Sequence, residues 1–129
     1  MRLLLDTHAF IWACVAPDKL SRAEQQAIED PENDVFVSAA SAWEIAIKRT
    51  LGRLEFPIER FEEFVFSTGF EALPVTARHA IAAGALPRHH DDPFDRMLIA
   101  QARLEGATMV TGDRKFPLYD VPLFRDLRV

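Results

Sequence analysis

The sequence predicts an α/β fold, in which helices cover both faces of a central, mostly parallel sheet. Short apolar runs such as Leu3-Leu4-Leu5 recur along the chain and have the length of buried strands. Longer segments with helix-starting and helix-ending residues separate these runs. Strands that alternate with helices are typical of parallel sheets, because each crossover connection places a helix against the sheet.

Four strands are expected, and each is a short, mainly apolar run. They are residues 2–5, 35–37, 71–75 and 107–111. Six helices are expected between them, and each has the length or the end residues of a helix. They are residues 8–15, 21–30, 38–52, 58–67, 76–85 and 94–105.

Several helix ends are marked by specific residues. Pro17 ends the first helix, and Ser21 with Glu24 forms a capping-box pattern at the start of the second. Ser38 or Ser41 starts the helix that contains Trp43, which ends at Gly52. The last helix follows Asp92-Pro93, a cap and a first-turn proline, and it ends at Gly106.

Length and composition favour one domain. A chain of 129 residues with 49% hydrophobic content can bury one sizeable core, so residues 1–129 are expected to form a single domain. Cys14 is the only cysteine, which excludes an intrachain disulfide and a cysteine-rich zinc site. Asp6 interrupts the first apolar run too early for a signal peptide, and no segment approaches ~20 apolar residues. We expect a cytoplasmic protein with no membrane segment.

The net charge of −5 argues against a protein that coats nucleic acid, because phosphate contacts require lysine and arginine. This objection is weaker for a nuclease, since bound cations neutralise a cluster of carboxylates locally. The basic residues are bunched as Lys48, Arg49 and Arg53 and as Arg114 with Lys115. For any one of them, a solvated helix face is the simpler explanation.

Four acidic residues lie beside apolar segments, where an isolated negative charge is costly. They are Asp6, Glu44, Asp95 and Asp113. Asp6 and Asp113 each follow an expected strand, and ligands of parallel sheets bind at the carboxyl ends of strands. Asp95 lies in the first turn of a helix, whose positive end favours an ionised acid. If the four carboxylates converge, their repulsion calls for a cation, and oxygen ligands suit Mg²⁺ or Mn²⁺. This pattern indicates a metal-dependent site for phosphodiester chemistry.

Taken singly, each acid has a structural explanation that is as good or better. Asp92 and Asp95 suit helix capping, and Glu44 is spaced to pair with Lys48, an arrangement that contributes only ~0.3–0.5 kcal/mol. The other two acids suit loop and turn positions. Only the joint placement favours a site, because independent caps need not gather on one sheet edge.

The histidines suggest a transition-metal site as a rival. His89, His90, Asp91 and Asp92 are contiguous, but the chain lacks the H-x-x-x-H spacing typical of zinc hydrolases. We expect His89 and His90 to lie in a solvent-exposed loop, and His8 to lie near the site or the substrate.

Four segments stand out together: LLLDTHAFIW, SAASAWEIAIK, LPRHHDDPFDRMLIAQA and VTGDRKF. In combination they resemble the PIN-domain ribonucleases, in particular VapC-type toxins of bacterial and archaeal toxin–antitoxin pairs. The resemblance extends from Met1 to about Phe124, and the tail from Arg125 to Val129 has no pattern that can be assigned. The family's four acids match Asp6, Glu44, Asp95 and Asp113. Its polar helper positions match Thr7 and Thr111, and Asp92 and Arg96 are further candidates for supporting or substrate contacts.

The resemblance implies a three-layer α/β/α fold and endonucleolytic cleavage of RNA that depends on Mg²⁺ or Mn²⁺. It also implies a small antitoxin partner and a homodimer. In such a site, the acids would hold one or two cations that activate water and offset charge on the leaving oxygen. Asp6 and Asp95 are the first candidates for direct ligands, while Asp113 and Glu44 are candidates for contact through water.

A non-catalytic interaction protein on the same fold is the alternative. The chain has ten Phe and two Trp, and the run Phe10-Ile11-Trp12 should not face inward as a whole on one regular helix. We therefore expect one of these residues to be exposed, on an apolar partner surface shared with the Trp43 helix. A receiver or phosphatase fits less well, because Asp6-Thr7-His8 lacks the paired acids such sites use.

Overall fold

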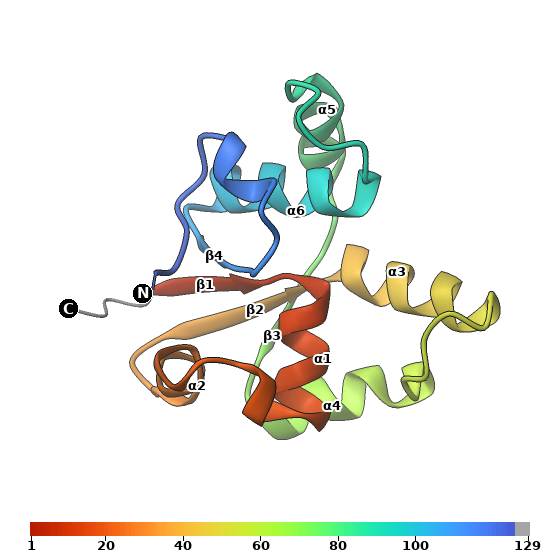
Figure 1. The fold of residues 1–129 in the computed structure, drawn as a ribbon, viewed down its shortest axis with the longest axis vertical. Helices are drawn as coiled ribbons and strands as arrows, with labels where there is room; N and C mark the ends of the chain where they lie inside the picture. The colour runs from red at the N-terminus through yellow and green to blue at the C-terminus, as the bar shows by residue number, and fades with distance from the viewer. Residues whose placement is uncertain (126–129) are drawn as a thin grey trace.

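Four parallel strands form the central sheet in the computed structural model, which describes residues 1–125 (Figure 1). The strands are β1 (Arg2–Leu5), β2 (Asp34–Ser38), β3 (Glu71–Leu73) and β4 (Thr108–Val110). Their order across the sheet is β3-β2-β1-β4, and every neighbouring pair is parallel. The expected parallel sheet is confirmed, although β3 and β4 are shorter than the runs in the sequence.

Strand β1 is central and pairs on both sides. Leu4 lies opposite Phe36 of β2 and opposite Met109 of β4. From β1 the chain moves outward to β2 and β3, and it then returns to place β4 on the other side of β1. The switch in strand order therefore falls between β1 and β4, which is where α/β sheets bind their ligands.

Six α-helices connect and cover the strands of the described chain. They are α1 (Thr7–Val15), α2 (Arg22–Glu29), α3 (Ala39–Thr50), α4 (Phe61–Thr68), α5 (Ala77–Ala85) and α6 (Pro93–Glu105). The capping box of Ser21 and Glu24 forms as expected, and Ser38, rather than Ser41, caps α3. Gly106 ends α6 in the left-handed conformation, with φ 65°. None of these helices is long and apolar enough to span a membrane.

The two faces of the sheet bury separate apolar clusters. Leu3 and Leu5 point to the face covered by α1 and α4, whereas Leu4 points to the face covered by α5 and α6. This alternation follows from the two-residue period of a strand. Because helices lie on both faces, the chain has the three-layer α/β/α arrangement, as expected (Figure 1).

Two segments differ from the expected elements. Residues 58–67 do not form one helix: Ile58–Arg60 is a 3-10 turn, and α4 starts at Phe61. The two pieces are separate because Arg60 has a ψ of 12°, outside the α-helical range. A further 3-10 turn, Phe116–Leu118, was not expected, and it buries Phe116 completely.

The expectation that Phe10, Ile11 or Trp12 would be exposed is wrong. Phe10 and Ile11 are buried, and Trp12 is partly buried. Helix α1 is enclosed on more than one side, since the Phe10 ring contacts Phe56, Phe61 and Phe70 on elements outside the sheet. A run of apolar residues can be buried when the helix is surrounded in this way. Trp43 of α3 is 64% exposed, so this part of the expected apolar surface is present. The tail residues 126–129 lie outside the described chain.

Candidate active site

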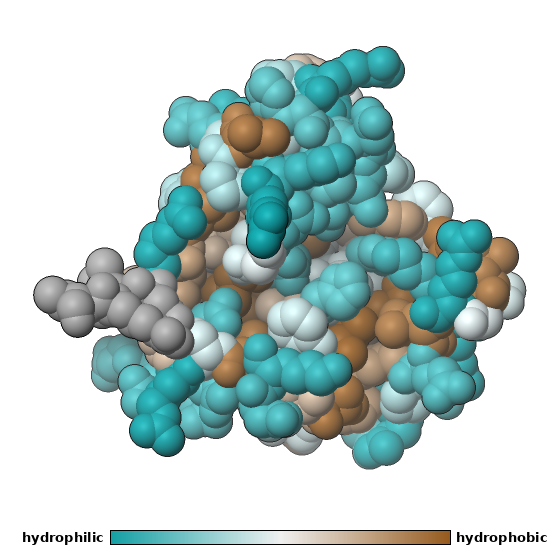
Figure 2. Space-filling model, in the orientation of Figure 1, coloured by the Kyte–Doolittle hydropathy of each residue, from teal (hydrophilic) through white to brown (hydrophobic). Residues whose placement is uncertain are grey.

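A cavity of about 450 Å³ lies at the carboxyl edge of the sheet, next to the ends of β1 and β4. All four acids singled out from the sequence line it: Asp6, Glu44, Asp95 and Asp113. Figure 2 shows the surface hollowed between the part of the molecule built from α5 and α6 and the part built from α1 and α3. The remaining lining residues are Thr7, His8, Ala9, Trp12, Leu20, Glu24, Lys48, His90, Asp92, Thr111 and Gly112.

Asp6 is fixed between β1 and α1. It caps α1, and its Oδ1 accepts the Ala9 N–H at 2.7 Å. Burial raises the pKa of Asp6, and the nearby Asp113 raises it further, while hydrogen bonds from Thr111 and from the Ala9 backbone lower it. This acid is therefore held rigidly and is poorly solvated, which makes its ionised form dependent on a nearby positive charge.

Glu44 is buried on α3 and has two side-chain partners. The Thr7 hydroxyl donates to Oε1 at 2.6 Å and lies 2.9 Å from the Ser41 hydroxyl. Lys48 donates to Oε2 at 2.5 Å, and this hydrogen bond is the largest of the influences that raise the lysine pKa. The ion pair with Lys48 and a position in the cavity thus occur together, so the two explanations of Glu44 do not exclude one another.

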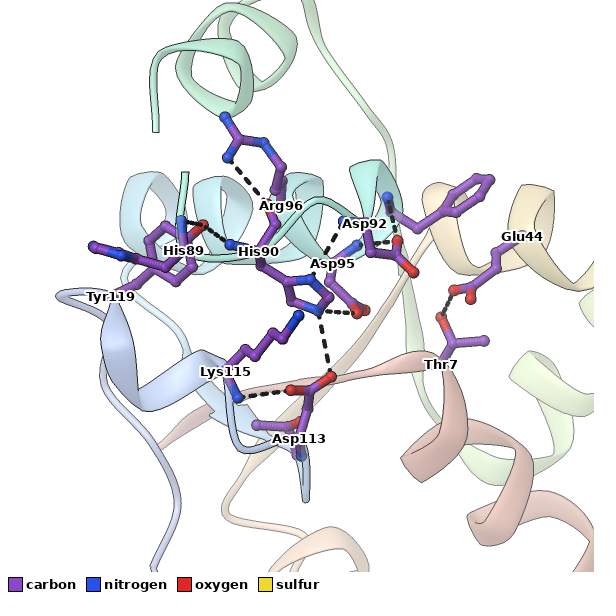
Figure 3. A network of polar contacts seen from close by, with 12 residues as sticks. Thr7, Glu44, His89, His90, Asp92, Asp95, Arg96, Asp113, Lys115 and Tyr119 are labelled. Carbon is purple, nitrogen blue, oxygen red and sulfur yellow. Dashed lines mark hydrogen bonds and ion pairs between the residues drawn. The ribbon is translucent and has the colours of Figure 1, made fainter. Parts of the chain in front are cut away.

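Asp95 lies in the first turn of α6, where Asp92 is the cap. Asp92 Oδ1 accepts the N–H groups of Phe94 and Asp95, at 2.8 Å and 3.1 Å. The Asp95 carboxylate is not used for capping and faces the cavity (Figure 3). The pKa of Asp95 is raised to about 7, mainly by burial and also by the negative charges of Asp92, Glu44 and Asp6, while His90 acts in the opposite direction.

Asp113 lies in the loop that follows β4. The Thr111 hydroxyl accepts its backbone N–H at 3.0 Å, and its own Oδ1 accepts the Lys115 N–H at 2.7 Å. The loop is thereby folded so that Oδ2 turns toward α6 (Figure 3). Its side chain is about one-third exposed, so Asp113 is the most accessible of the four acids described here.

His90 does not lie in a solvent-exposed loop, so that expectation is wrong. The residue is 9% exposed, and its Nε2 lies 2.8 Å from Asp95 Oδ2 and 3.3 Å from Asp113 Oδ2. Tyr119 holds the loop before α6 inward, since its hydroxyl accepts the N–H groups of both His89 and His90. His89 stays exposed, as expected. In the sequence, the one local signal at His90 is its position two residues before a helix cap. That position does not specify which way the side chain points.

The supporting residues divide between two places. Thr7, Thr111 and Asp92 line the cavity, as does His8, which is exposed. Arg96 does not line it. Its guanidinium donates instead to the carbonyl groups of Ala83, Leu86 and Pro87. The role of Arg96 in this structure is to hold the end of α5 and the loop after it.

The donor set of the cavity fits a hard divalent cation. Oxygen ligands from Asp6, Asp95 and Asp113 come from three elements, and atoms of Asp95, Asp113 and His90 lie within 4.8 Å of one another. Several carboxylates in a poorly hydrated site repel one another, and bound cations are the usual compensation. Such a site can polarise a phosphate group and activate water.

Comparisons with known proteins give a family. Residues 3–122 match the PIN domain family model. The chain is 33% identical to Ribonuclease VapC22 of Mycobacterium tuberculosis over 120 residues, which cover 88% of each protein. It has the fold found in the VapBC2 structure from Rickettsia felis bound to a promoter DNA fragment, with a TM-score of 0.69, 17% identity, and coverage of 95% of this chain and 96% of that one. The FitAcB structure from Neisseria gonorrhoeae is also similar, with a TM-score of 0.61, 22% identity and the same coverage. Because the family match spans nearly the whole chain and the relative is 33% identical over most of its length, the chain belongs to the PIN-domain family, and within it to the VapC type.

Proposed function

We propose that this chain is an Mg²⁺- or Mn²⁺-dependent endoribonuclease toxin that a cognate antitoxin inhibits. The observation that carries the proposal is the convergence of Asp6, Glu44, Asp95 and Asp113 on one cavity at the switch in strand order. The name of the relative VapC22, a ribonuclease, supports RNA as the substrate. The structural neighbours include a toxin–antitoxin complex from Klebsiella pneumoniae, with a TM-score of 0.57, which supports an antitoxin partner. A single domain over residues 1–129 and a homodimer remain part of the proposal.

The residues divide the chemistry among them. A bound cation supplies Lewis acidity toward the scissile phosphate and a lower pKa for the attacking water. Asp6 and Asp95 are the proposed direct ligands, which is supported by the burial of Asp6, the partial burial of Asp95 and the fixed backbones of both at helix starts. Asp113 is proposed to orient water, which its greater exposure supports. Glu44, whose Oε1 accepts the Thr7 hydroxyl, is oriented toward the same cavity.

Lys48 provides the positive charge on the α3 side of the cavity. Its side chain is 35% exposed, so its ammonium group can reach a phosphate while it remains paired with Glu44. RNA carries one negative charge per phosphate, and such contacts dominate the affinity of nucleic-acid binding. A cavity of carboxylates flanked by a lysine suits a substrate that brings its phosphate to a cation.

Removing charge from the acids tests the proposal without changing their shape. Asp6→Asn and Asp95→Asn should each fold and lose RNA cleavage by at least ~10²-fold, because a neutral amide is a weaker ligand for a hard cation. EDTA should silence the wild type, and Mg²⁺ or Mn²⁺ should restore it. Asp91→Asn is the matched control, since Asp91 is exposed in the loop before α6 and does not line the cavity. Wild-type cleavage by the folded Asp6→Asn, Asp95→Asn double variant, free of host nucleases, would reject the site.

The alternative, an interaction protein without catalysis, is favoured by exposed aromatic residues. Trp43 is 64% exposed and Phe66 is 88% exposed, and apolar surface gathers near α3 and α4 in Figure 2. Such patches often take a partner. The cleavage assay separates the two functions: a chain that binds an antitoxin but never cleaves RNA with Mg²⁺ or Mn²⁺ is an interaction protein.

A further inference from the structure

His90 is the polar side chain whose role the four-carboxylate site does not explain. Its Nε2 atom is buried and points between Asp95 Oδ2, at 2.8 Å, and Asp113 Oδ2, at 3.3 Å (Figure 3). Both contacts are within ion-pair distance, but among the described residues neither forms a hydrogen bond with this nitrogen. A bare nitrogen lone pair this close to two carboxylate oxygens would be repelled by them, so the two short distances favour a proton on Nε2.

The other ring nitrogen indicates which tautomer is present. Nδ1 accepts the backbone N–H of Asp92 at 3.3 Å, so it offers a lone pair there. A neutral imidazole with an accepting Nδ1 carries its proton on Nε2. The opposite tautomer would set an Nδ1–H against the Asp92 N–H. This opposite tautomer, with its proton on Nδ1, is the one that a cation bound at Nε2 would require, because metal-binding histidines normally donate from the other ring nitrogen.

The His90 ring is fixed from several sides, so its direction is not accidental. Its backbone N–H donates to the Tyr119 hydroxyl at 2.9 Å, and that hydroxyl donates to the Pro87 carbonyl at 2.7 Å. Its carbonyl accepts from Arg96 at 3.3 Å, and its ring packs edge-on against Phe116. Phe116 is fully buried, so the 3-10 turn that follows the Asp113 loop forms one wall of the ring's site.

We propose that His90 is a positioning residue whose Nε2–H lies between Asp95 and Asp113 and, by its attraction to both carboxylates, sets the spacing of these two acids for a divalent cation. It ties α6 to the loop after β4, two segments with no backbone pairing to each other at this point. The positive end of the N–H lies beside Oδ2 of each acid and offsets part of their mutual repulsion. The inference rests on the proposed function, because the purpose of the spacing is cation binding.

Nitrogen NMR tests the tautomer without metal or RNA. In protein labelled with ¹⁵N-histidine, at mildly alkaline pH, His90 should show a protonated Nε2 and a bare Nδ1, both with EDTA and with saturating Mg²⁺. The His90→Asn variant assigns the signals among the four histidines of the chain. A bare Nε2 in either condition overturns the proposal, and a bare Nε2 only with Mg²⁺ would make His90 a metal ligand instead.

Two substitutions separate positioning from general structural support. His90→Gln places an amide N–H near the position of Nε2, whereas His90→Asn places its amide near Nδ1 and leaves the acids without a donor. Calorimetric titration should show Mg²⁺ affinity reduced by about 10–100-fold in His90→Asn, the range for lost partners of metal ligands, and largely restored in His90→Gln. His89→Asn is the matched control, because His89 is exposed and lies outside the cavity.

The two proposals fail in different ways. If His90→Gln and His90→Asn weaken Mg²⁺ binding equally while both variants melt like the wild type, the positioning role of the His90 Nε2–H is rejected and the cation site stands. If the wild type binds no Mg²⁺ or Mn²⁺ in the same titration, the proposed function is rejected, and with it the purpose assigned to His90.

Discussion

Asp95 is an acid whose charge depends strongly on its surroundings. An aspartate in water is ionised at neutral pH, but burial beside Asp92, Glu44 and Asp6 raises the pKa of Asp95 to about 7. Below about pH 7 the metal-free protein therefore keeps a proton on Asp95, in a site that is proposed to hold a cation. Cation binding releases this proton, which links metal affinity to pH.

This shift predicts how stability changes with pH in EDTA. The pKa of Asp95 rises from 3.8 in a free aspartate to about 7 in the folded state, so the folded protein retains a proton that the unfolded chain loses. The stabilisation is fully present below about pH 4 and is lost as pH rises toward 7, by up to ~1.4 kcal/mol per pH unit. We expect the free energy of unfolding of the wild type to fall over this range relative to Asp95→Asn. Urea titrations of both proteins at a series of pH values measure this difference, and parallel curves would contradict it.

Helix ends show that the elements follow from local chemistry. Asp92 caps α6 with two hydrogen bonds, and Gly106 ends the same helix at a positive φ that other residues adopt only with strain. In contrast, Gly84 lies inside α5 with open space around the position of a Cβ atom. These two glycines should respond to the same substitution in opposite ways.

Alanine at each glycine provides the test. Gly106→Ala should reduce the free energy of unfolding by about 1 kcal/mol, because alanine is strained in the left-handed region. Gly84→Ala should increase it by about 0.5 kcal/mol, because alanine has the higher helix propensity and meets no atom. Both are read from thermal or urea unfolding. A stable Gly106→Ala variant would mean that the helix end is not under this constraint.

Sequence reasoning succeeded where local chemistry decides the outcome. The capping box of Ser21, the start of α6 and the strand β1 depend on residues close in the chain, and they were predicted. The direction of His90 depends on Tyr119, which is twenty-nine residues away, and no local pattern encodes that contact. The burial of Phe10 likewise depends on distant aromatic residues that enclose α1.

The sheet edge explains why four separate acids could be selected from sequence. Parallel strands bring their carboxyl ends to one edge, so an acid after β1 and an acid after β4 meet once those strands are neighbours. Glu44 and Asp95 reach the same cavity from α3 and α6. The general position of the site follows from topology, whereas the orientation of each carboxylate follows from partners such as Thr7, Thr111 and Lys115.

For the whole molecule, we predict that metal binding raises thermal stability. A cation that binds only the folded state at a concentration 100 times its Kd adds about 2.7 kcal/mol, which corresponds to a Tm increase of several degrees. Asp95→Asn should show a smaller increase, because it lacks one candidate ligand and one repelling charge. Scanning calorimetry with MgCl₂ or MnCl₂ measures the effect, with NaCl at matched ionic strength as the control. An equal increase in both proteins, or none in the wild type, would show that Asp95 takes no part in binding.

The pairing of β1 with β4 also determines when an activity can arise during protein synthesis. Leu3 leaves the ribosome early, but its partner Thr108 and the acid Asp113 are made only after all of α1 to α6. Contacts between such distant residues form slowly, because a long loop must close before they stabilise the chain. A nascent chain that ends before residue 113 has Asp6, Glu44 and Asp95 but lacks the fourth acid, and before residue 108 it also lacks one of the two strands that flank β1. A nascent chain therefore cannot assemble the four-acid cavity before residue 113 has been added.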